Sequence, residues 1–199
     1  MKAITVNFEK TKKDLEVLAA ACAAEKEHKY NIAMLHIYND SARKKLVATN
    51  GKVLAVLDIP EELEASRELE GVKHMTYKNG VLLEVSCNSE FPSWWRCVSD
   101  AAMIDFPSDN YKKEWTKRGK AQGVRNMSVI CAGTGKTFDF CYSKCFEFDI
   151  EKWLPFAEQG RPCQVTGHGL TVVIMPYGGN MYQDTQEQFK TVNTKTKTA

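Results

Sequence analysis

The sequence lacks most of the features that mark membrane, secreted and nucleic-acid-binding proteins. None of its apolar runs approaches the roughly 20 residues of a membrane-spanning helix, so no membrane span is expected. Residues 1–10 alternate polar and apolar side chains without the apolar stretch of a secretory signal, which favours a cytoplasmic protein. The net charge of +2 is too small to predict nucleic-acid binding by itself.

The cysteine pattern argues against a disulfide or zinc framework. The seven cysteines are odd in number and no two are spaced as C-x-x-C, so we expect reduced and mostly buried thiols. Cys141 and Cys145 would share one face of a strand, but only His168 lies near them in the sequence. No metal site and no cofactor are therefore predicted.

Catalytic motifs are missing as well. No serine lies in a G-x-S-x-G elbow, and the four histidines are dispersed, with His36 in an apolar run that favours a packed side chain. Residues 132–137 resemble a phosphate-binding loop, but Ile130 replaces its first glycine and residues 137–142 alternate like a strand. We predict a hairpin turn there, no catalytic residues, and a protein that is not an enzyme.

What the sequence does contain is a series of alternating apolar runs separated by turn residues. Ile4–Phe8 predicts a first strand, and Asp14–Lys26 predicts an amphipathic helix opened by a capping box at Thr11–Asp14. The dipeptide Asn50-Gly51 predicts a type I′ turn. Hairpins are expected over residues 45–59, 73–85, 127–142 and 162–175.

The remaining segments are less regular. Glu61–Glu70 predicts a short helix or loop, and Tyr111–Arg125 is basic without a clear period. Cys145–Phe148 is expected to extend a sheet, and Asp149–Gln159 to form a short helix. Residues 183–199 are polar and expected to be disordered. The predicted fold class is α+β, with antiparallel sheets and helices packed on one face.

Basic residues gather in two places. One group opens the predicted first helix, and the other surrounds Tyr111 and Trp115. Such a distribution suits sequence-independent phosphate contacts, although a solvated loop has the same composition. The residues are Lys10, Lys12 and Lys13 in the first group, and Lys112, Lys113, Lys117, Arg118, Lys120 and Arg125 in the second.

Three distant segments resemble the bacterial DNA polymerase III β subunit, the replicative sliding clamp. A-T-N-G-K-V-L-A-V at 48–56 is similar to the A-T-D-G-H-R-L-A-V segment of that family, and V-V-I-M-P at 172–176 to its final V-V-M-P-M strand. F-P-S-W-W-R-C-V at 91–98 is similar to its F-P-D-Y-R-R-V segment. The chain is shorter than the three-domain family, which suggests a phage or prophage member.

The resemblance implies a DNA-clamp-like fold with a groove for partner peptides. The groove residues it implies are Thr49, Gly51, Val53, Leu54, Val173, Met175 and Pro176. The alternative is that the hairpin and the last strand pack in the core and bind nothing. The resemblance also implies that the first helix lines a ring around DNA. The DNA-contacting residues would be Lys10, Lys12, Lys13, Lys112, Lys113, Lys117, Arg118 and Lys120.

We therefore expect two shortened clamp-like lobes, 1–103 and 104–182, before the tail 183–199. A single clamp-like domain with an insertion is the competing architecture. The expected function is that of a processivity factor, a homo-oligomer that tethers a polymerase to DNA and binds peptides of replication proteins. The alternatives are a monomeric protein–protein adaptor that keeps the groove, and a small nucleic-acid binder that uses residues 111–125.

Overall fold

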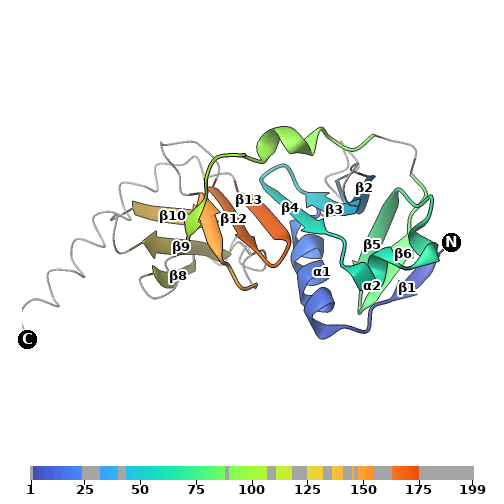
Figure 1. Cartoon of the computed structure of the whole chain (residues 1–199). Coiled ribbons are helices and arrows are strands. Elements are labelled where there is room, and N and C mark those ends of the chain that lie inside the picture. The colour runs from blue at the N-terminus through green and yellow to red at the C-terminus, as the bar shows by residue number, and fades with distance from the viewer. Residues whose placement is uncertain are drawn as a thin grey trace, which may run out of the picture.

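A ten-stranded antiparallel sheet dominates the computed structural model (Figure 1). Its strand order is β1-β6-β5-β2-β3-β4-β13-β12-β11-β7. A separate three-stranded sheet has the order β10-β9-β8. The structure describes residues 2–23, 32–39, 44–87, 90–106, 111–117, 125–131, 136–140, 145, 148–154 and 163–174, with only the backbone described for 111–117, 125–131 and 136–140.

The strands of the large sheet are β1 (Ala3–Thr5), β2 (Leu35–Asn39), β3 (Lys44–Thr49), β4 (Val53–Asp58), β5 (His74–Lys78), β6 (Val81–Glu84), β7 (Ile104–Asp105), β11 (Lys152–Leu154), β12 (Cys163–Gly167) and β13 (Leu170–Ile174). The small sheet comprises β8 (Tyr111–Lys117), β9 (Arg125–Cys131) and β10 (Lys136–Phe140). The helices are α1 (Glu9–Ala21), α2 (Glu61–Glu64) and the 3₁₀ turns η2 (Arg67–Leu69) and η3 (Trp94–Cys97). The predicted α+β class with antiparallel sheets is confirmed.

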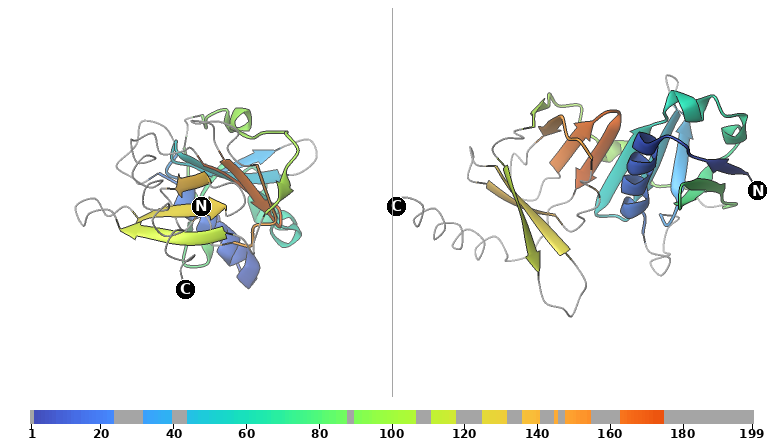
Figure 2. Two further views of the ribbon diagram at one scale, coloured as in Figure 1. Left: turned by 90° about the vertical axis from the view of Figure 1, so that its left-hand side faces the viewer. Right: turned by 90° about the horizontal axis from the view of Figure 1, so that it is seen from below.

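Helix α1 covers one face of the large sheet, packing against β3, β4 and β5 (Figures 1 and 2). Its buried stripe includes Leu15 and Leu18, which are fully enclosed with Leu46 and Met75 of the sheet. Full burial of a leucine side chain stabilises a fold by roughly 1.5–3 kcal/mol. We call this apolar set the helix-side core; it fixes α1 to the sheet.

The start of α1 differs from the prediction. The helix begins at Glu9, and the residue before it, Phe8, makes no side-chain capping bond. The predicted capping box at Thr11–Asp14 is wrong because both residues lie within the helix on its buried stripe. The Thr11 hydroxyl instead donates a hydrogen bond of 2.7 Å to the Glu62 carboxylate.

All four predicted hairpins are confirmed by their antiparallel pairing. The β5–β6 turn has positive φ at both Asn79 and Gly80, as a type I′ turn requires. The β3–β4 turn is not of type I′, because only Gly51 has a positive φ and it occupies the first central position. Asn50 closes that turn through its side-chain oxygen, which accepts the backbone N–H groups of Lys52 and Val53.

The region after residue 110 was predicted less well. Tyr111–Lys117, which has no clear period, forms strand β8. The predicted helix at 149–159 is wrong over its described part, because Lys152–Leu154 pairs with β12 and buries Trp153 there. Cys145 and Phe148 are not strand residues, so the strand predicted at 145–148 is wrong at these two residues, which are the described part of it.

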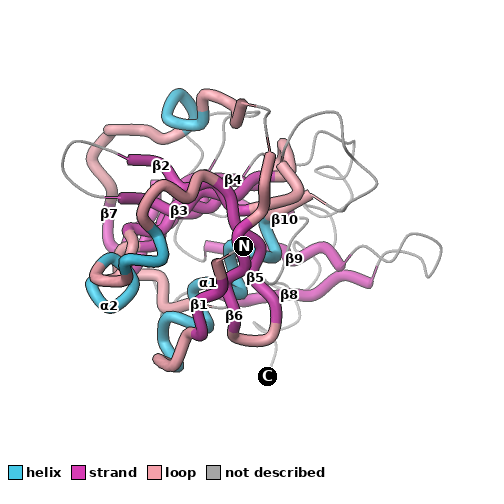
Figure 3. Tube along the Cα trace, turned by 90° about the vertical axis from the view of Figure 1, so that its right-hand side faces the viewer, coloured by secondary structure: helices cyan, strands magenta, loops and turns pink. Residues whose placement is uncertain are grey.

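The large sheet runs across the predicted lobe boundary at residue 103. Strand β4 of the first predicted lobe pairs with β13 of the second over five residue pairs. The backbone at Asp149 passes close to Gly167 of β12. A side chain at position 167 would clash with the Asp149 carbonyl, so glycine permits this approach. Figure 3 shows the sheet from the end that carries the N-terminus. The lobe division itself stays a prediction.

Candidate functional site

A second apolar cluster lies on the sheet face opposite α1. It buries Val47, Leu54, Val56, Trp94 and Val173, with Tyr38, Phe91 and Val98 packed at its margin. We call it the outer cluster. Its members come from strands β2, β3, β4 and β13 and from residues 91–98, which cross above the sheet (Figure 1). We call residues 91–98 the strap.

Strand pairing brings two of the implied groove residues together. Val173 is the Cα partner of Leu54 across β4 and β13, and both belong to the outer cluster. Val53 belongs instead to the helix-side core, because neighbouring residues of a strand point to opposite faces. Leu54 and Val173, but not Val53, therefore face the strap.

The other implied groove residues lie around the tip of the β3–β4 hairpin or outside the described residues. The Thr49 hydroxyl donates to the Val53 carbonyl at 2.8 Å and accepts the Gly51 N–H at 3.1 Å. These bonds fix the hairpin tip, and Gly51 is exposed there. Met175 and Pro176 follow β13 directly and lie outside the described residues.

The strap closes most of the outer cluster from solvent. Leu54 is 6% exposed and Val173 4%, because Trp94 packs over them. The Trp94 indole is itself buried, and its Nε1 has no hydrogen-bond partner among the described residues. Trp95 of the strap is 50% exposed and Val98 is half-buried, so a partner could touch both side chains, as well as the exposed Pro92, Ser93, Arg96 and Cys97.

Aromatic contacts hold the strap on the sheet. The Phe91 ring stacks on His36 with centroids 4.8 Å apart, and Trp94 meets Tyr38 edge-on at 5.4 Å. Burial, and secondarily the neighbouring His74, lower the pKa of His36 to about 4, so the imidazole is neutral at pH 7. The predicted packed role of His36 agrees with this contact.

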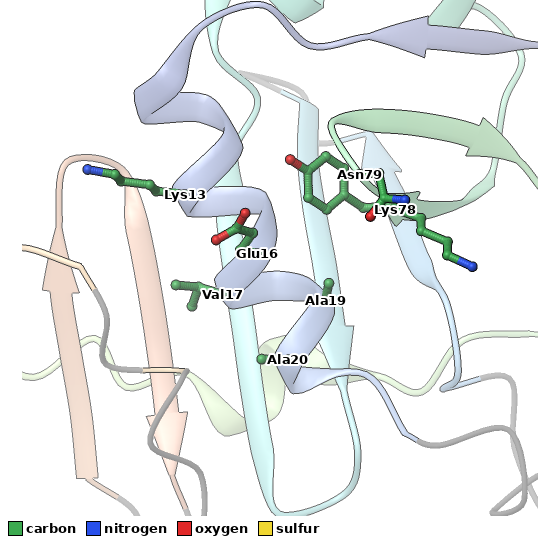
Figure 4. A pocket seen from close by; sticks show the side chains of 8 residues that line it. Lys13, Glu16, Val17, Ala19, Ala20, Lys78 and Asn79 are labelled. Carbon is green, nitrogen blue, oxygen red and sulfur yellow. The ribbon is translucent and has the colours of Figure 1, made fainter.

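The helix side carries the first group of basic residues. Lys10 and Lys13 are exposed on α1, and Lys12 lies 3.8 Å from the Glu9 carboxylate. A depression of about 780 Å³ lies between α1 and the β5–β6 turn, lined among others by Lys13, Glu16 and Lys78. Figure 4 shows Lys13 and Lys78 pointing away from one another with Glu16 between them, so this depression has no concentrated positive charge.

The second basic group lies partly on strand β8 and partly outside the described residues. Lys112, Lys113 and Lys117 lie on β8, where only the backbone is described. Arg118 and Lys120 lie outside the described residues. Their predicted contact with DNA stays a prediction.

Two further features are absent from the described part of the chain. No group of three or more His, Cys, Asp or Glu side chains is placed to hold a metal ion there. Within the same residues, no helix combines the length and apolar character needed to cross a membrane.

Comparison with known proteins gives a match in three dimensions. No protein-family model matches the chain, and no curated protein is similar to it in sequence. The chain is similar to the beta sliding clamp of C. crescentus, solved with polyethylene glycol in a region assigned to beta-motif tethering, at 15% identity and a TM-score of 0.50. It is similar to a protein from Eubacterium rectale assigned as a DNA polymerase III beta subunit, at 11% identity and a TM-score of 0.51.

The chain has the fold of the bacterial sliding clamps. The two comparisons cover 89% and 90% of this chain but only 65% and 66% of those proteins. The chain thus spans slightly less than two thirds of the length of these clamps. At such low identity the likeness concerns the fold, and function rests on the residues themselves.

Sequence reasoning missed two residues that shape the clamp-like outer face. The buried Trp94 appeared in the sequence only as part of a family-like segment, although its size and apolar character favour burial. Gln164 was not singled out, because its partner Ser99 lies far away in the sequence.

Proposed function

We propose that this chain is a non-enzymatic, sliding-clamp-like replication accessory. It associates with DNA without sequence preference through one face and with peptides of replication proteins through the other. It carries out no chemical step, and its contribution is to keep a polymerase close to its template.

The observation that carries this proposal is the convergence of three segments. The hairpin with Leu54, the strand with Val173 and the strap with Trp94 and Val98 are far apart in the sequence and meet in the outer cluster. These are the three segments whose sequences resemble the sliding clamps. A chance likeness of short apolar motifs gives no reason for all three to meet on one face.

The proposed peptide groove lies at the margin of the outer cluster. In this proposal Leu54 and Val173 would form its floor, and Val98, which packs at the margin of the same cluster, would form a wall. A partner peptide would seat a leucine or phenylalanine there, and each buried anchor contributes roughly 1.5–3 kcal/mol before ordering costs. Because the floor is nearly covered, the peptide must pack against the strap as well as the strands.

The proposed DNA contacts lie on the opposite side. Lys10, Lys12 and Lys13 belong to α1, which covers the other face of the sheet. Ammonium groups on one helix attract phosphates regardless of base sequence, and salt weakens that attraction strongly. The two proposed partners can thus bind at the same time, as tethering requires.

Encircling DNA requires a ring that closes around the duplex, and in this proposal several copies of the chain build that ring. We propose a cytoplasmic homo-oligomeric ring or partial ring. The test is retention on DNA: the protein is loaded onto a nicked circular plasmid, filtered by size, and filtered again after the circle is cut. A ring stays with the circle and leaves the linear form, and sedimentation gives an oligomer.

A monomer that binds a Leu- and Phe-containing peptide but is not retained on the circle would contradict the ring. That outcome supports the protein–protein adaptor. Retention on both circular and linear DNA would instead indicate simple electrostatic binding.

A further inference from the structure

A buried glutamine is hydrogen-bonded to the segment that connects the two predicted lobes. Gln164 of β12 is only 5% exposed. Its Oε1 accepts the backbone N–H of Ser99 at 2.8 Å, and its Nε2 donates to the backbone carbonyl of Ser99 at 3.3 Å. One side chain thus satisfies both backbone groups of one residue, as a neighbouring strand would.

Strand β12 contacts this connecting segment at a second residue, Met103. The Gln164 Nε2 lies 3.6 Å from the Met103 sulfur, and the Thr166 hydroxyl lies 3.8 Å from it. Between these points the Ser99 hydroxyl accepts the N–H of Ala101 at 3.2 Å. The sulfur contacts are weak, so the two bonds to Ser99 dominate this attachment.

Ser99 directly follows the strap. Within the strap the Trp94 N–H donates to the Pro92 carbonyl and the Val98 N–H to that of Trp95. The turn η3 has four residues and no side-chain cap. The phenylalanine at the start of the strap stacks on His36, so Gln164 fixes the other end, next to Val98.

We propose that Gln164 is the positioning residue of the peptide groove. It holds Ser99, and thereby keeps Val98 beside Leu54 and Val173, without touching the peptide itself. A wall held in place before binding spares the peptide the cost of ordering it. This inference rests on the proposed function, since it assigns Gln164 a role in that same groove.

Two variants and a control test the proposal. Gln164→Leu keeps a similar volume and removes both bonds to Ser99, while Gln164→Glu keeps an acceptor for the Ser99 N–H but loses the donor. Thr166→Val removes only a contact with the Met103 sulfur. Amide hydrogen exchange at residues 94–99 and binding of a fluorescein-labelled heptapeptide with Leu and Phe anchors are measured for each protein.

We expect Gln164→Leu to exchange about tenfold faster at the Ser99 and Val98 amides and to bind the peptide about tenfold more weakly. Two hydrogen bonds between uncharged groups contribute a free energy of this size. Exchange in α1 should not change. Gln164→Glu should also speed exchange at Ser99, because its carboxylate cannot donate to the Ser99 carbonyl, and it gives a second reading if the leucine variant does not fold. Thr166→Val should match the wild type.

Three results would overturn the inference. These are unchanged exchange at Ser99 and Val98 in both Gln164 variants, faster exchange spread equally over α1, and peptide affinity that does not change when the strap loosens. A wild-type protein that binds no such peptide would contradict the proposed groove instead. Exchange at Ser99 would still show whether Gln164 holds the strap.

Discussion

Leu54 of β4 and Val173 of β13 are directly opposite one another in an antiparallel strand pair, beneath the indole of Trp94. This pairing joins the two predicted lobes into one sheet. It also explains how a hairpin and a strand at opposite ends of the sequence can form one apolar floor. The outer cluster is therefore both a structural connection and the best candidate for partner binding.

The first prediction concerns the groove wall. Val98→Ala removes two methyl groups from the margin of the outer cluster and should weaken heptapeptide binding by about tenfold, at roughly 0.8 kcal/mol per buried carbon. Val81→Ala, another half-buried valine but on strand β6, should leave the affinity unchanged. Fluorescence anisotropy measures both, and equal affinity of the two variants would place the peptide elsewhere.

The second prediction concerns DNA. Replacing Lys10 and Lys13 together by alanine should weaken binding to every sequence alike, because both side chains are exposed on α1. The slope of log affinity against log salt should become shallower by about 2, at roughly 0.9 per lost phosphate contact. Lys73 and Lys152, which are exposed outside helices, provide the matched double-alanine control. An unchanged salt slope would remove α1 from the DNA interface.

The third prediction concerns the buried Asp14 of α1. Burial raises the pKa of its carboxyl group, opposed by Lys10 and His168. A folded-state pKa above the unfolded value means that stability falls as pH rises through that range. Asp14→Asn should therefore increase the free energy of unfolding at pH 7. Urea titrations should show this difference shrinking toward pH 3.5, whereas a less stable Asn variant at pH 7 would show that the carboxylate is favourably bonded.

The fourth prediction concerns the thiols. Burial raises the pKa of Cys22 and of Cys163 to about 12, so their reactive thiolate forms are rare at pH 8. Cys97 is exposed on the strap. Brief treatment with iodoacetamide should label Cys97 well before the other two, as peptide mass spectrometry can show. Equal labelling of all three would mean that the helix-side core opens readily.

Local signals were enough to predict much of the fold. The hairpins follow from turn residues such as Asn79-Gly80, which set the pairing on their own. The helix predicted at 149–159 was wrong over its described residues, 149–154, because Trp153 pairs with β12 and its ring meets that of Phe106 at 5.7 Å. Such distant partners override local preference.

The residues of the candidate site were likewise predicted only in part. The family-like segments pointed to Leu54 and Val173, which lie in one cluster because β4 pairs with β13. Val53 was included with Leu54, although the two-residue period of a strand places neighbours on opposite faces. No local pattern could have identified Gln164, whose role depends on a partner 65 residues away.

The central claim is that partner peptides bind at the outer cluster, and methyl NMR of the wild-type protein tests it most directly. Adding the heptapeptide with Leu and Phe anchors should shift the methyl signals of Leu54, Val98 and Val173. The methyl signals of Leu15 and Leu18, in the helix-side core, should stay in place. Shifts confined to the helix side, or no shifts at peptide saturation, would contradict the account.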